Sequence, residues 1–356
     1  MELVIKTLTP LWTGGVNTGV DRLHETGILG GLRWWLEVFV RGLGGWVNDP
    51  TQNERSSFDQ NEYDKSKAMD KDERACLRDA GLCDVSQIFG ATGWRRRFRL
   101  DVHDNTSPER SVAAEIHAQR AYTDRNGKSR TPAWYFPKNL QEKPRSGQLT
   151  IKIQSLAQDF QPEIMAGLVQ FISDWTAIGA RAQMGFGVIE PVNNRLDTQS
   201  LYNWLVTTVG SETYPRLPSL QNIFLARIHK PNATDQDTFN LKYDLRQLFS
   251  NDRNLRHFVM GTVQGGRMAA KVKISRPYGN DLMRVWGWIP EKANVYTSSW
   301  SRHTVVDAIH QHLQTNYVLQ VWREMKSTRD TVAPNTSDAQ VFLRSLLGLT
   351  EVSDAT

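Results

Sequence analysis

Residues 28–43 read ILGGLRWWLEVFVRGL and predict the helix around which the first half of the chain folds. Apolar side chains recur there at three- and four-residue steps, so they share one face of a helix. That face carries Ile28, Leu32, Trp35, Leu36, Phe39 and Leu43. Arg33, Glu37 and Arg41 follow one another at four-residue steps on a different face, where each pair of opposite charges contributes about 0.2–0.5 kcal/mol.

Strand-forming segments lie on both sides of this helix. They are rich in β-branched and aromatic residues and tend to alternate in polarity. The strands are predicted at residues 2–8, 95–102, 113–122 and 148–156. A second amphipathic helix at residues 164–175 precedes a glycine-rich loop at 179–187 and a strand that ends at Pro191. The order β, α, several β, α and β is compatible with a ferredoxin-like module.

The second half repeats this order. Strands are expected from Asn222 and at 268–275 and 283–289, and helices at 241–249, 304–322 and 337–347. Short strings repeat as well: Leu32-Arg33 corresponds to Leu245-Arg246, and Phe89-Gly90 corresponds to Met260-Gly261. A basic strand follows in both halves. We infer an internal duplication, and hence an α+β protein of two tandem ferredoxin-like domains.

The composition is that of a globular protein long enough for two domains. The chain has 356 residues, of which 39% are hydrophobic, and a net charge of +5. The domains are expected at residues 1–195 and 196–356. Residues 49–80 are rich in charged and amide side chains and poor in large apolar ones. We expect them to form a charged insertion in the first domain, outside its core.

The cysteine content and the hydropathy of the chain indicate the cellular compartment in which we expect the protein. Cys76 and Cys83 are too few for a disulfide framework or a four-thiolate zinc site. No apolar run reaches the roughly 18 residues that span a bilayer, and residues 1–10 lack the apolar core of a signal peptide. We therefore expect a soluble, cytoplasmic protein with reduced thiols that does not act at a membrane.

Three glycine-rich segments are candidates for contact with RNA. The first, Thr13-Gly14-Gly15, precedes the helix, where glycines let backbone N–H groups approach a phosphate. Arg22, Arg33 and Arg41 place positive charge near it. The segment lacks the Gly-Lys-Ser/Thr of a nucleotide-binding P-loop. A flexible surface loop beside an intrahelical charge ladder is the alternative interpretation.

The second segment, residues 89–97, reads FGATGWRRR. Its candidate residues are Gly90, Thr92, Trp94, Arg95 and Arg97. Arginines neutralise phosphates, and an exposed tryptophan stacks on a base for about 1–3 kcal/mol. Neighbours in a strand alternate, so Arg95 and Arg97 would share one face and Arg96 the other. The competing interpretation is a core tryptophan followed by a solvated run of charge.

The third segment, residues 179–187, reads GARAQMGFG and includes Arg181, Gln183 and Met184. A helix C-cap needs one glycine rather than three, so we favour RNA binding over a cap followed by a hairpin. In the second half, Arg246 and Arg267 are the candidates. We expect Arg33 to contribute more to RNA binding than Arg246, because only the first half has the full set of glycines.

These segments should meet in space. In a ferredoxin-like sheet, loops from distant positions in the chain can lie at one edge. The residues expected to converge on one RNA backbone are Gly14, Gly15, Arg33, Thr92 and Arg181.

No motif for catalysis or metal binding occurs. HExxH, GxSxG and paired-cysteine patterns are absent. Asp21 and Asp84 have no carboxylate neighbour at a spacing that would hold Mg²⁺, and His310 and His312 point in different directions from one helix. We therefore predict no catalytic residue, no metal and no cofactor. His24, beside the first glycine segment, is the best-placed general base for cleavage at a 2′-hydroxyl.

Taken together, four strings resemble a known family. They are TPLWTGG at 9–15, GGLRWW at 30–35, IFGATGW at 88–94 and GARAQMGFG at 179–187. In this order they resemble the RAMP superfamily of CRISPR-associated proteins and, more closely, the first-numbered subunits of type III-B Cmr effector complexes. The match in the second half is limited to its Leu-Arg helix and the Met-Gly-Thr turn at 260–262.

The resemblance implies two ferredoxin-like (RRM-like) domains and a role in antiviral defence. It implies an RNA-binding subunit that caps the 3′ end of the CRISPR guide RNA and meets the 5′ side of the target RNA. The implied neighbours are a second end-cap RAMP subunit, the repeated backbone RAMP subunit and the small helical subunit. In that family the backbone subunit cleaves the target, so this chain would be non-catalytic.

Two alternatives stay open. A metal-independent RAMP endoribonuclease that processes guide precursor RNA would need a histidine such as His24 within reach of the glycine segments. An assembly protein would use its tryptophans for protein contacts, and its affinity for RNA would not depend on salt.

Overall fold

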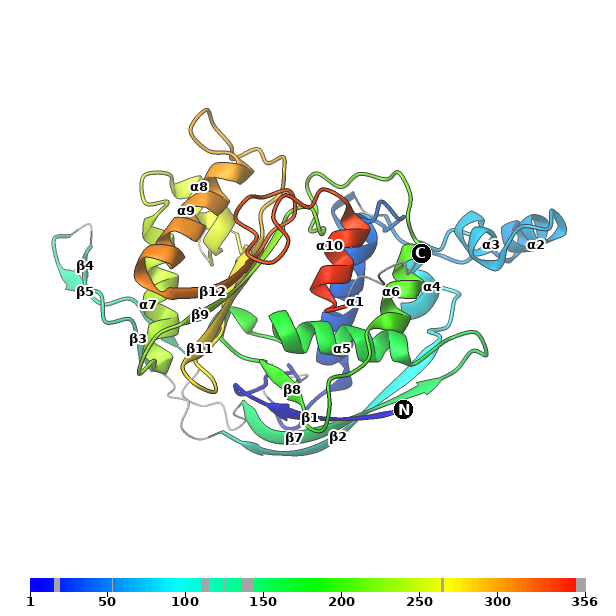
Figure 1. The fold of residues 1–356 in the computed structure, drawn as a ribbon, viewed down its shortest axis with the longest axis horizontal. Coiled ribbons are helices and arrows are strands. Elements are labelled where there is room, and N and C mark those ends of the chain that lie inside the picture. Colours follow the sequence, from blue (N-terminus) through cyan, green and yellow to red (C-terminus); the bar gives the residue numbers. More distant parts are fainter. Residues whose placement is uncertain are drawn as a thin grey trace, which may run out of the picture.

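The computed structural model describes residues 1–15, 20–52, 54–109, 115–124, 126–135, 144–263 and 266–349. In these residues, two four-stranded antiparallel sheets follow one another along the chain, each with its own helices (Figure 1). The protein therefore has a mixed α/β fold with antiparallel sheets. No helix in the described ranges is long and apolar enough to cross a membrane.

The first sheet has the strand order β2-β7-β1-β8, and each neighbouring pair is antiparallel. Its strands are β1 (Glu2–Thr7), β2 (Phe98–Pro108), β7 (Arg145–Ser155) and β8 (Ile189–Pro191). The two long helices beside it are α1 (Glu25–Gly42) and α5 (Glu163–Trp175). Leu3 and Ile5 of β1 are buried in the same cluster as the apolar face of α1, whereas Glu2 and Val4 are exposed. This alternation explains the pattern in the sequence.

The second sheet has the order β10-β11-β9-β12, again with antiparallel neighbours. Its strands are β9 (Ile223–His229), β10 (Val272–Ile274), β11 (Leu282–Trp288) and β12 (Val318–Arg323). The helices α7 (Asp235–Gln247) and α9 (Arg302–Asn316) pack in its core. Counted within each half, both sheets have the order second, third, first, fourth.

One predicted helix is in fact a helix followed by a strand. We expected a helix over 304–322, but α9 ends at Asn316, and Tyr317 has an extended backbone with φ −139° and ψ 163°. The next six residues form β12 and pair with β9. This corrects the expectation, because β-branched and aromatic residues such as Val318, Val321 and Trp322 favour a strand when a partner edge is available.

Three predicted strands have different bounds in the structure: one begins later and extends further than expected, and the other two are shorter. The strand predicted at 95–102 begins only at Phe98, because residues 91 and 94 exchange backbone hydrogen bonds in a tight turn. In the segments 113–122 and 268–275, the strands are β3 (Glu115–His117), the start of β4 (Tyr122–Thr123) and β10. Residues 113 and 114 lie outside the described residues. Because β2 begins only at Phe98, none of Arg95, Arg96 and Arg97 lies in a strand. The prediction that these arginines alternate between the two faces of a strand is wrong.

The remaining elements connect and cover the two sheets. In the first half they are η1 (Pro50–Gln52), α2 (Gln60–Ala68), α3 (Glu73–Asp79), α4 (Asp84–Phe89), β5 (Ser129–Arg130), β6 (Ala133–Tyr135) and η2 (Ala182–Met184). After β8 they are α6 (Gln199–Val206), α8 (Arg253–Met260) and α10 (Ala339–Leu346).

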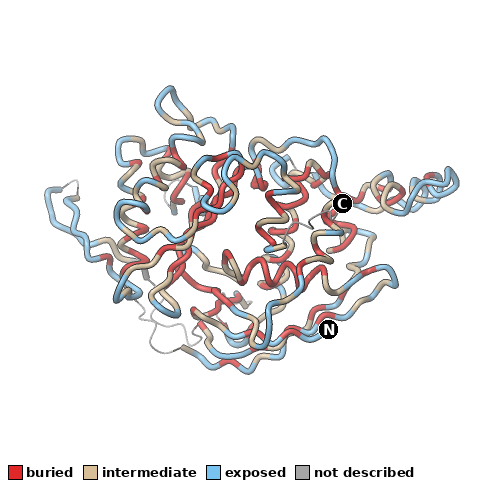
Figure 2. The backbone as a smooth tube through the Cα atoms, viewed as in Figure 1, coloured by how far each residue is buried: buried red, intermediate tan, exposed pale blue. Residues whose placement is uncertain are grey.

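The helices α2 and α3 project from the body of the molecule (Figure 1). We call residues 59–80 the α2–α3 arm. Its surface is mainly exposed (Figure 2), and the two hydrophobic clusters include no described residue of 49–80. Cys76 and Leu77 are buried within the base of the arm.

The larger hydrophobic cluster crosses the boundary between the halves. It joins α1, α5 and the first sheet to Leu225 and Trp286 of the second sheet. The last described helix, α10, also belongs to it through Phe342 and Leu346. The Trp175 indole N–H donates to the carbonyl oxygen of Leu346 over 3.0 Å, which fixes α10 against α5. The chain thus returns to its first half after the second sheet is complete.

Two arginines of the second sheet bind the C-terminal end of α5. Arg284 on β11 is 4% exposed and donates to the carbonyl oxygens of Ile172, Ser173 and Thr176 at 3.2, 2.6 and 2.8 Å. Arg227, its cross-strand partner on β9, donates to the carbonyl oxygen of residue 174 at 2.6 and 3.2 Å. Cations at a helix C-terminus satisfy carbonyls that have no partner within the helix.

Replacing Arg284 should therefore destabilise the whole protein. We expect Arg284→Met to lower the free energy of unfolding by about 2–4 kcal/mol, because buried carbonyls lose their donors. The matched control is Arg99→Met on the exposed face of β2, where we expect a change within about 0.5 kcal/mol. Urea unfolding measures both variants, and equal losses would contradict the role of Arg284.

Candidate nucleic-acid interface

The first glycine segment fixes the start of α1. Thr13 is completely buried, and its hydroxyl accepts a hydrogen bond from the His24 backbone N–H over 2.8 Å. Gly27 lets Thr13 pack against the helix, because a Cβ at residue 27 would lie 3.1 Å from that of Thr13. Thr13 is therefore a structural residue, whereas Gly14 is exposed with open space beside it.

The third segment packs directly on the first. The N–H of Ala180 donates to the carbonyl oxygen of Trp12 over 2.6 Å, and the N–H of Gly187 donates to Pro10 over 3.0 Å. Gly187 has φ +91°, and a Cβ there would lie 2.0 Å from the carbonyl oxygen of Ile178. Glycine is needed at this position because the two backbones lie too close together to leave room for a side chain.

The second segment reaches α1 through Arg33. Its guanidinium donates to the carbonyl oxygen of Gly90 at 3.5 Å and to the hydroxyl of Ser86 at 3.3 Å. Two residues earlier, Gly31 faces the third segment, since a Cβ there would lie 3.8 Å from the backbone nitrogen of Gly179. All three glycine segments therefore meet around the N-terminal half of α1. Gly30, on this part of the helix, is exposed and faces open space.

Several predicted contact residues are engaged inside the protein. Arg41 is 3% exposed, and its guanidinium donates to Glu37 at 2.9 Å and to the carbonyl oxygen of Pro218 at 3.3 Å. The charge ladder is present, but its last arginine is buried instead of lying on a solvated face. Met184 is also buried. We exclude Arg41, Met184 and Thr13 from the surface that could contact RNA.

Trp94 lies beside the α2–α3 arm. Its indole N–H donates to the carbonyl oxygen of Gln87 at 3.0 Å, and its ring centroid lies 5.0 Å from that of Phe58. Arg97 lies 5.4 Å from the same ring and forms ion pairs with Asp159 and Glu73. This agrees with the interpretation of Trp94 as a packed residue.

The exposed residues of the second segment are Thr92, Gly93 and Arg95. Thr92 and Gly93 lie in the tight turn before β2, and Arg95 follows it. No described residue forms an ion pair with Arg95, so its charge is available to a ligand. Arg22, near the first segment, is also exposed and pairs with Glu25 at 3.3 Å.

Arg181 lies between the glycines of the third segment in a left-handed conformation, with φ +57°. Its guanidinium stacks 4.2 Å from the centre of the Trp12 ring, and burial lowers its pKa. Gln183 is exposed, while its carbonyl oxygen accepts a hydrogen bond from Lys242 of α7 at 2.9 Å. The third segment therefore also joins the two halves.

The sequence-based search missed three lysines near this junction. Burial lowers the pKa of Lys242, Lys271 and Lys273 to about 8 each. The ammonium group of Lys273 lies 5.6 Å from the centre of the Trp34 ring on α1. The alternation KVKI at 271–274 could have indicated that two of these lysines share one face of a strand.

The internal repeat is visible in the hydrogen bonds. Arg246 of α7 donates to the carbonyl oxygen of Gly261 at 3.0 Å, as Arg33 of α1 does to that of Gly90. Each glycine ends a short helix, α8 or α4, with φ of +74° or +85°. Arg267, the other candidate in this half, is exposed. The arginine of the first helix thus holds the same turn in both halves.

The comparison with family models shows to which protein family the chain belongs. Residues 4–190, more than half of the chain, match the family model of the RAMP superfamily. The chain belongs to the RAMP superfamily. No curated protein matches it.

Solved structures that resemble this RAMP protein are distant from it in sequence. The crystal structure of apo Cmr1 from Pyrococcus furiosus is 11% identical, with 88% of this chain and 96% of that chain covered and a TM-score of 0.41. A cryo-EM structure of type III-B Cmr-beta bound to cognate target RNA is 11% identical, with coverages of 88% and 99% and a TM-score of 0.43. A second one, also with AMPPnP and single-stranded DNA present, is 12% identical, with coverages of 88% and 98% and a TM-score of 0.42.

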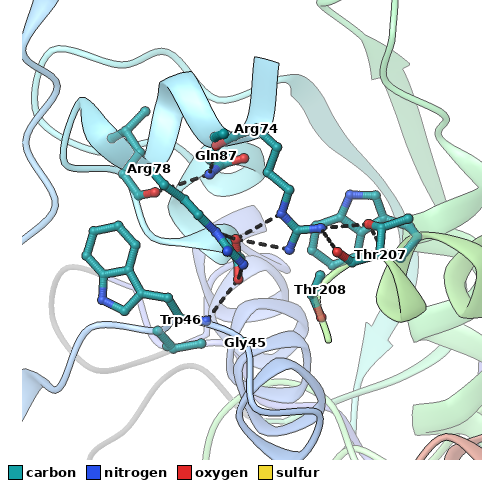
Figure 3. Close-up of polar contacts among 12 residues, drawn as sticks. Gly45, Trp46, Arg74, Arg78, Gln87, Thr207 and Thr208 are labelled. Atoms are coloured by element: carbon teal, nitrogen blue, oxygen red, sulfur yellow. Dashed lines mark hydrogen bonds and ion pairs between the residues drawn. The ribbon is translucent and has the colours of Figure 1, made fainter. Parts of the chain in front are cut away.

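Asp84 of the RAMP protein is a structural carboxylate at the start of α4. Figure 3 shows its partners Trp46, Arg74 and Arg78 around it. Asp84 is fully buried and accepts hydrogen bonds from the Trp46 backbone N–H at 2.9 Å, from Arg78 at 2.7 and 2.8 Å and from Arg74 at 3.1 Å. Arg74 continues to the side chain of Thr207 at 2.7 Å, just after α6. The carboxylate therefore joins the α2–α3 arm to the body of the first half.

Neither aspartate that we considered for Mg²⁺ has metal-binding surroundings. The oxygens of Asp84 are taken by two guanidinium groups, and Asp21 lies 2.6 Å from Nε2 of His24. The hydrogen bond to His24 is the main cause that lowers the pKa of Asp21. Across the described ranges, no group of three or more His, Cys, Asp or Glu residues could hold a metal ion.

Neutralising Asp84 should loosen the arm. We expect Asp84→Asn to lower the free energy of unfolding by about 3 kcal/mol, because two arginines then lose their counter-charge in a buried site. The control is Asp79→Asn, whose exposed carboxylate pairs with Lys71 at the surface and should contribute little to stability. Urea unfolding gives the energies, and limited proteolysis of residues 59–80 reports the arm. If Asp84→Asn and the wild type resist the protease equally, Asp84 does not hold the α2–α3 arm to the body.

Proposed function

We propose that this RAMP protein is a non-catalytic RNA-binding subunit of a type III-B CRISPR effector complex that acts in antiviral defence. In this role it caps the 3′ end of the guide RNA and meets the 5′ side of the target RNA. Three lines support the proposal: membership of the superfamily, the four strings that resemble the first-numbered Cmr subunits, and the meeting of the glycine segments.

The meeting of the glycine segments is the observation that carries the proposal. Three segments that are far apart in the chain surround the N-terminal half of α1, where exposed Gly14 and Gly30 have no side chain to keep a ligand away from the surface. Arg22, Arg95 and Arg181 lie on the same segments or beside them. Arginines beside such an open surface can contact the phosphates of an RNA backbone.

We further propose that each half is a ferredoxin-like domain. The repeated strand order and the equivalent bonds of Arg33 and Arg246 support this interpretation. The division near residue 195 stays a proposal. The helices α6 and α10 come after this position in the chain but pack with the first half, so we propose that they complete the first domain. Residues 49–80 are then the insertion in that domain.

The partners that we propose follow from the same role. They are the CRISPR guide RNA, the target RNA, the second end-cap RAMP subunit, the backbone RAMP subunit and the small helical subunit. The protein would act in the cytoplasm. A cofactor is not part of this proposal.

A second candidate function is a metal-independent ribonuclease. The observation in its favour is the contact of 2.6 Å between His24 and Asp21, because a carboxylate can orient a histidine for general-base catalysis. The side chain of Asp21 is 61% exposed, so this pair lies at the surface and not in an enclosed site. Binding without cleavage therefore remains our first proposal.

A negative charge at the meeting point should weaken RNA binding. We expect Gly30→Asp to bind single-stranded RNA about tenfold more weakly than Gly30→Asn, because the added carboxylate repels the phosphates. The asparagine variant is the matched control for shape and for helix propensity. Fluorescence anisotropy with a labelled RNA measures both, and equal affinities would contradict RNA contact at the N-terminal half of α1.

The isolated protein should not cleave RNA. We expect labelled guide precursor RNA to stay intact during incubation with the purified chain, with or without Mg²⁺, as judged on denaturing gels. The reason is that the sequence contains no recognised catalytic motif and that the His24–Asp21 pair lies at the surface. Specific cleavage that His24→Ala abolishes would establish the ribonuclease function instead.

A further inference from the structure

The two equivalent arginines lie in opposite electrostatic surroundings. Arg33 forms an ion pair with Glu37 at 3.1 Å, and Glu37 also pairs with Arg41. In the second half, the residue four positions after Arg246 is Ser250, which cannot neutralise it. Burial and the positive charge of Arg256 lower the pKa of Arg246. The first half has therefore neutralised its arginine, and the second half has not.

Further cations line the adjacent face of α8. Arg253, Arg256 and His257 are spaced at three and four residues, so they share one side of this helix. Arg253 is exposed, and the other two are half-buried. Burial and then the charges of Arg253, Arg256 and Arg246 hold the pKa of His257 below its usual value of 6.5. These four residues form what we call the α7–α8 cation face.

No carboxylate in the described part of the chain balances this face. Asp252 is the N-cap of α8 and accepts a hydrogen bond from the Leu255 backbone N–H at 2.9 Å, while Asp244 pairs with Arg120 at 3.6 Å. Among the residues that the structure describes, none forms an ion pair with Arg246, Arg253 or Arg256. The Nε of Arg256 is buried without a hydrogen-bond partner. The protein thus holds like charges together, at a cost that a bound anion would offset.

We propose that the α7–α8 cation face binds phosphates of the RNA backbone, so that the second half provides a phosphate-binding site of its own. This inference rests on the proposed RNA-binding function and adds a second site to it. It also reverses our expectation from the sequence that Arg33 contributes more than Arg246, because the unneutralised charge lies in the second half.

RNA is favoured over an acidic protein as the occupant. Guanidinium groups form paired hydrogen bonds with phosphate oxygens, and three arginines from two helices offer several such forks. A polyanion can also engage several cations at once and release their counterions. The Arg246 side chain already holds the turn at Gly261, so the face is fixed before a ligand arrives.

The test uses the full-length chain and fluorescein-labelled single-stranded oligouridine RNA. We expect the double variant Arg253→Gln/Arg256→Gln to bind about tenfold more weakly than the wild type and to lose about 1.4 from the slope of log affinity against log salt, which corresponds to two phosphate contacts. The matched control is Lys6→Gln/Lys152→Gln. It removes the same charge from exposed ion pairs on the first sheet and should leave the slope unchanged.

A pH profile provides a second readout. Phosphate beside His257 raises the pKa of this residue, so RNA binding takes up a proton and the affinity increases as the pH falls from about 7.5 to about 5.5. His257→Gln should flatten this dependence. The other titratable or charged groups packed against α8 are Arg246 from α7, Lys271 before β10 and Tyr296 after β11. Arg246 and Tyr296 keep their charge state in this range. Lys271, whose pKa is lowered to about 8, gains some positive charge near pH 7.5, so only the part of the pH dependence that His257→Gln removes is assigned to His257.

The outcomes separate this site from the proposed function. If the wild type binds RNA and the arginine double variant binds it equally well with the same salt slope, the α7–α8 site is wrong while the proposed function stands. If that variant then fails to join its complex, the face binds an acidic protein instead. If the wild type does not bind RNA even at low salt, both proposals fail. Thermal melting of all variants identifies any loss that comes from unfolding.

Discussion

The structure depends on the arginines that connect the second sheet to the end of α5. Arg227 and Arg284 are cross-strand neighbours, and together they donate to the carbonyl oxygens of four consecutive or nearly consecutive residues, Ile172, Ser173, Asp174 and Thr176. A helix end without partners could not be buried between two sheets. These bonds therefore make the junction possible and set the position of the second half relative to the first.

The third glycine segment follows α5 directly, so the same junction positions the candidate RNA surface. Gly185 accepts a hydrogen bond from the backbone N–H of Arg276 at 3.1 Å, and Gln183 accepts one from Lys242 at 2.9 Å. Both donors belong to the second half. A change at this boundary would therefore move the loop that also contacts Trp12 and Gly31. The backbone of the third glycine segment therefore serves both the candidate RNA surface and the packing of the two halves.

Local sequence patterns predicted the helices and strands better than they predicted the surroundings of single side chains. Spacing identified the faces of α1 and α5, and the Leu-Arg string pointed to two arginines that make equivalent hydrogen bonds. Spacing did not show that Arg41 is buried beneath residue 218, because that contact comes from a distant segment. The pairing of Arg33 with Glu37 was visible in the spacing, but the proximity of Arg246 to Arg256 of α8 was not. Charge balance depends on which helices become neighbours, and only the tertiary structure provides that information.

The return of α10 to the first half affects how the protein is made. Phe342, Leu343 and Leu346 complete a hydrophobic cluster whose other members are mostly encoded before residue 206. During synthesis, the first sheet can form early, but this apolar surface stays uncovered until the ribosome has produced the whole second sheet and α10. The first half is thus translated first, but its hydrophobic cluster is completed last. Until α10 is made, the uncovered apolar surface of the first half is available to a chaperone.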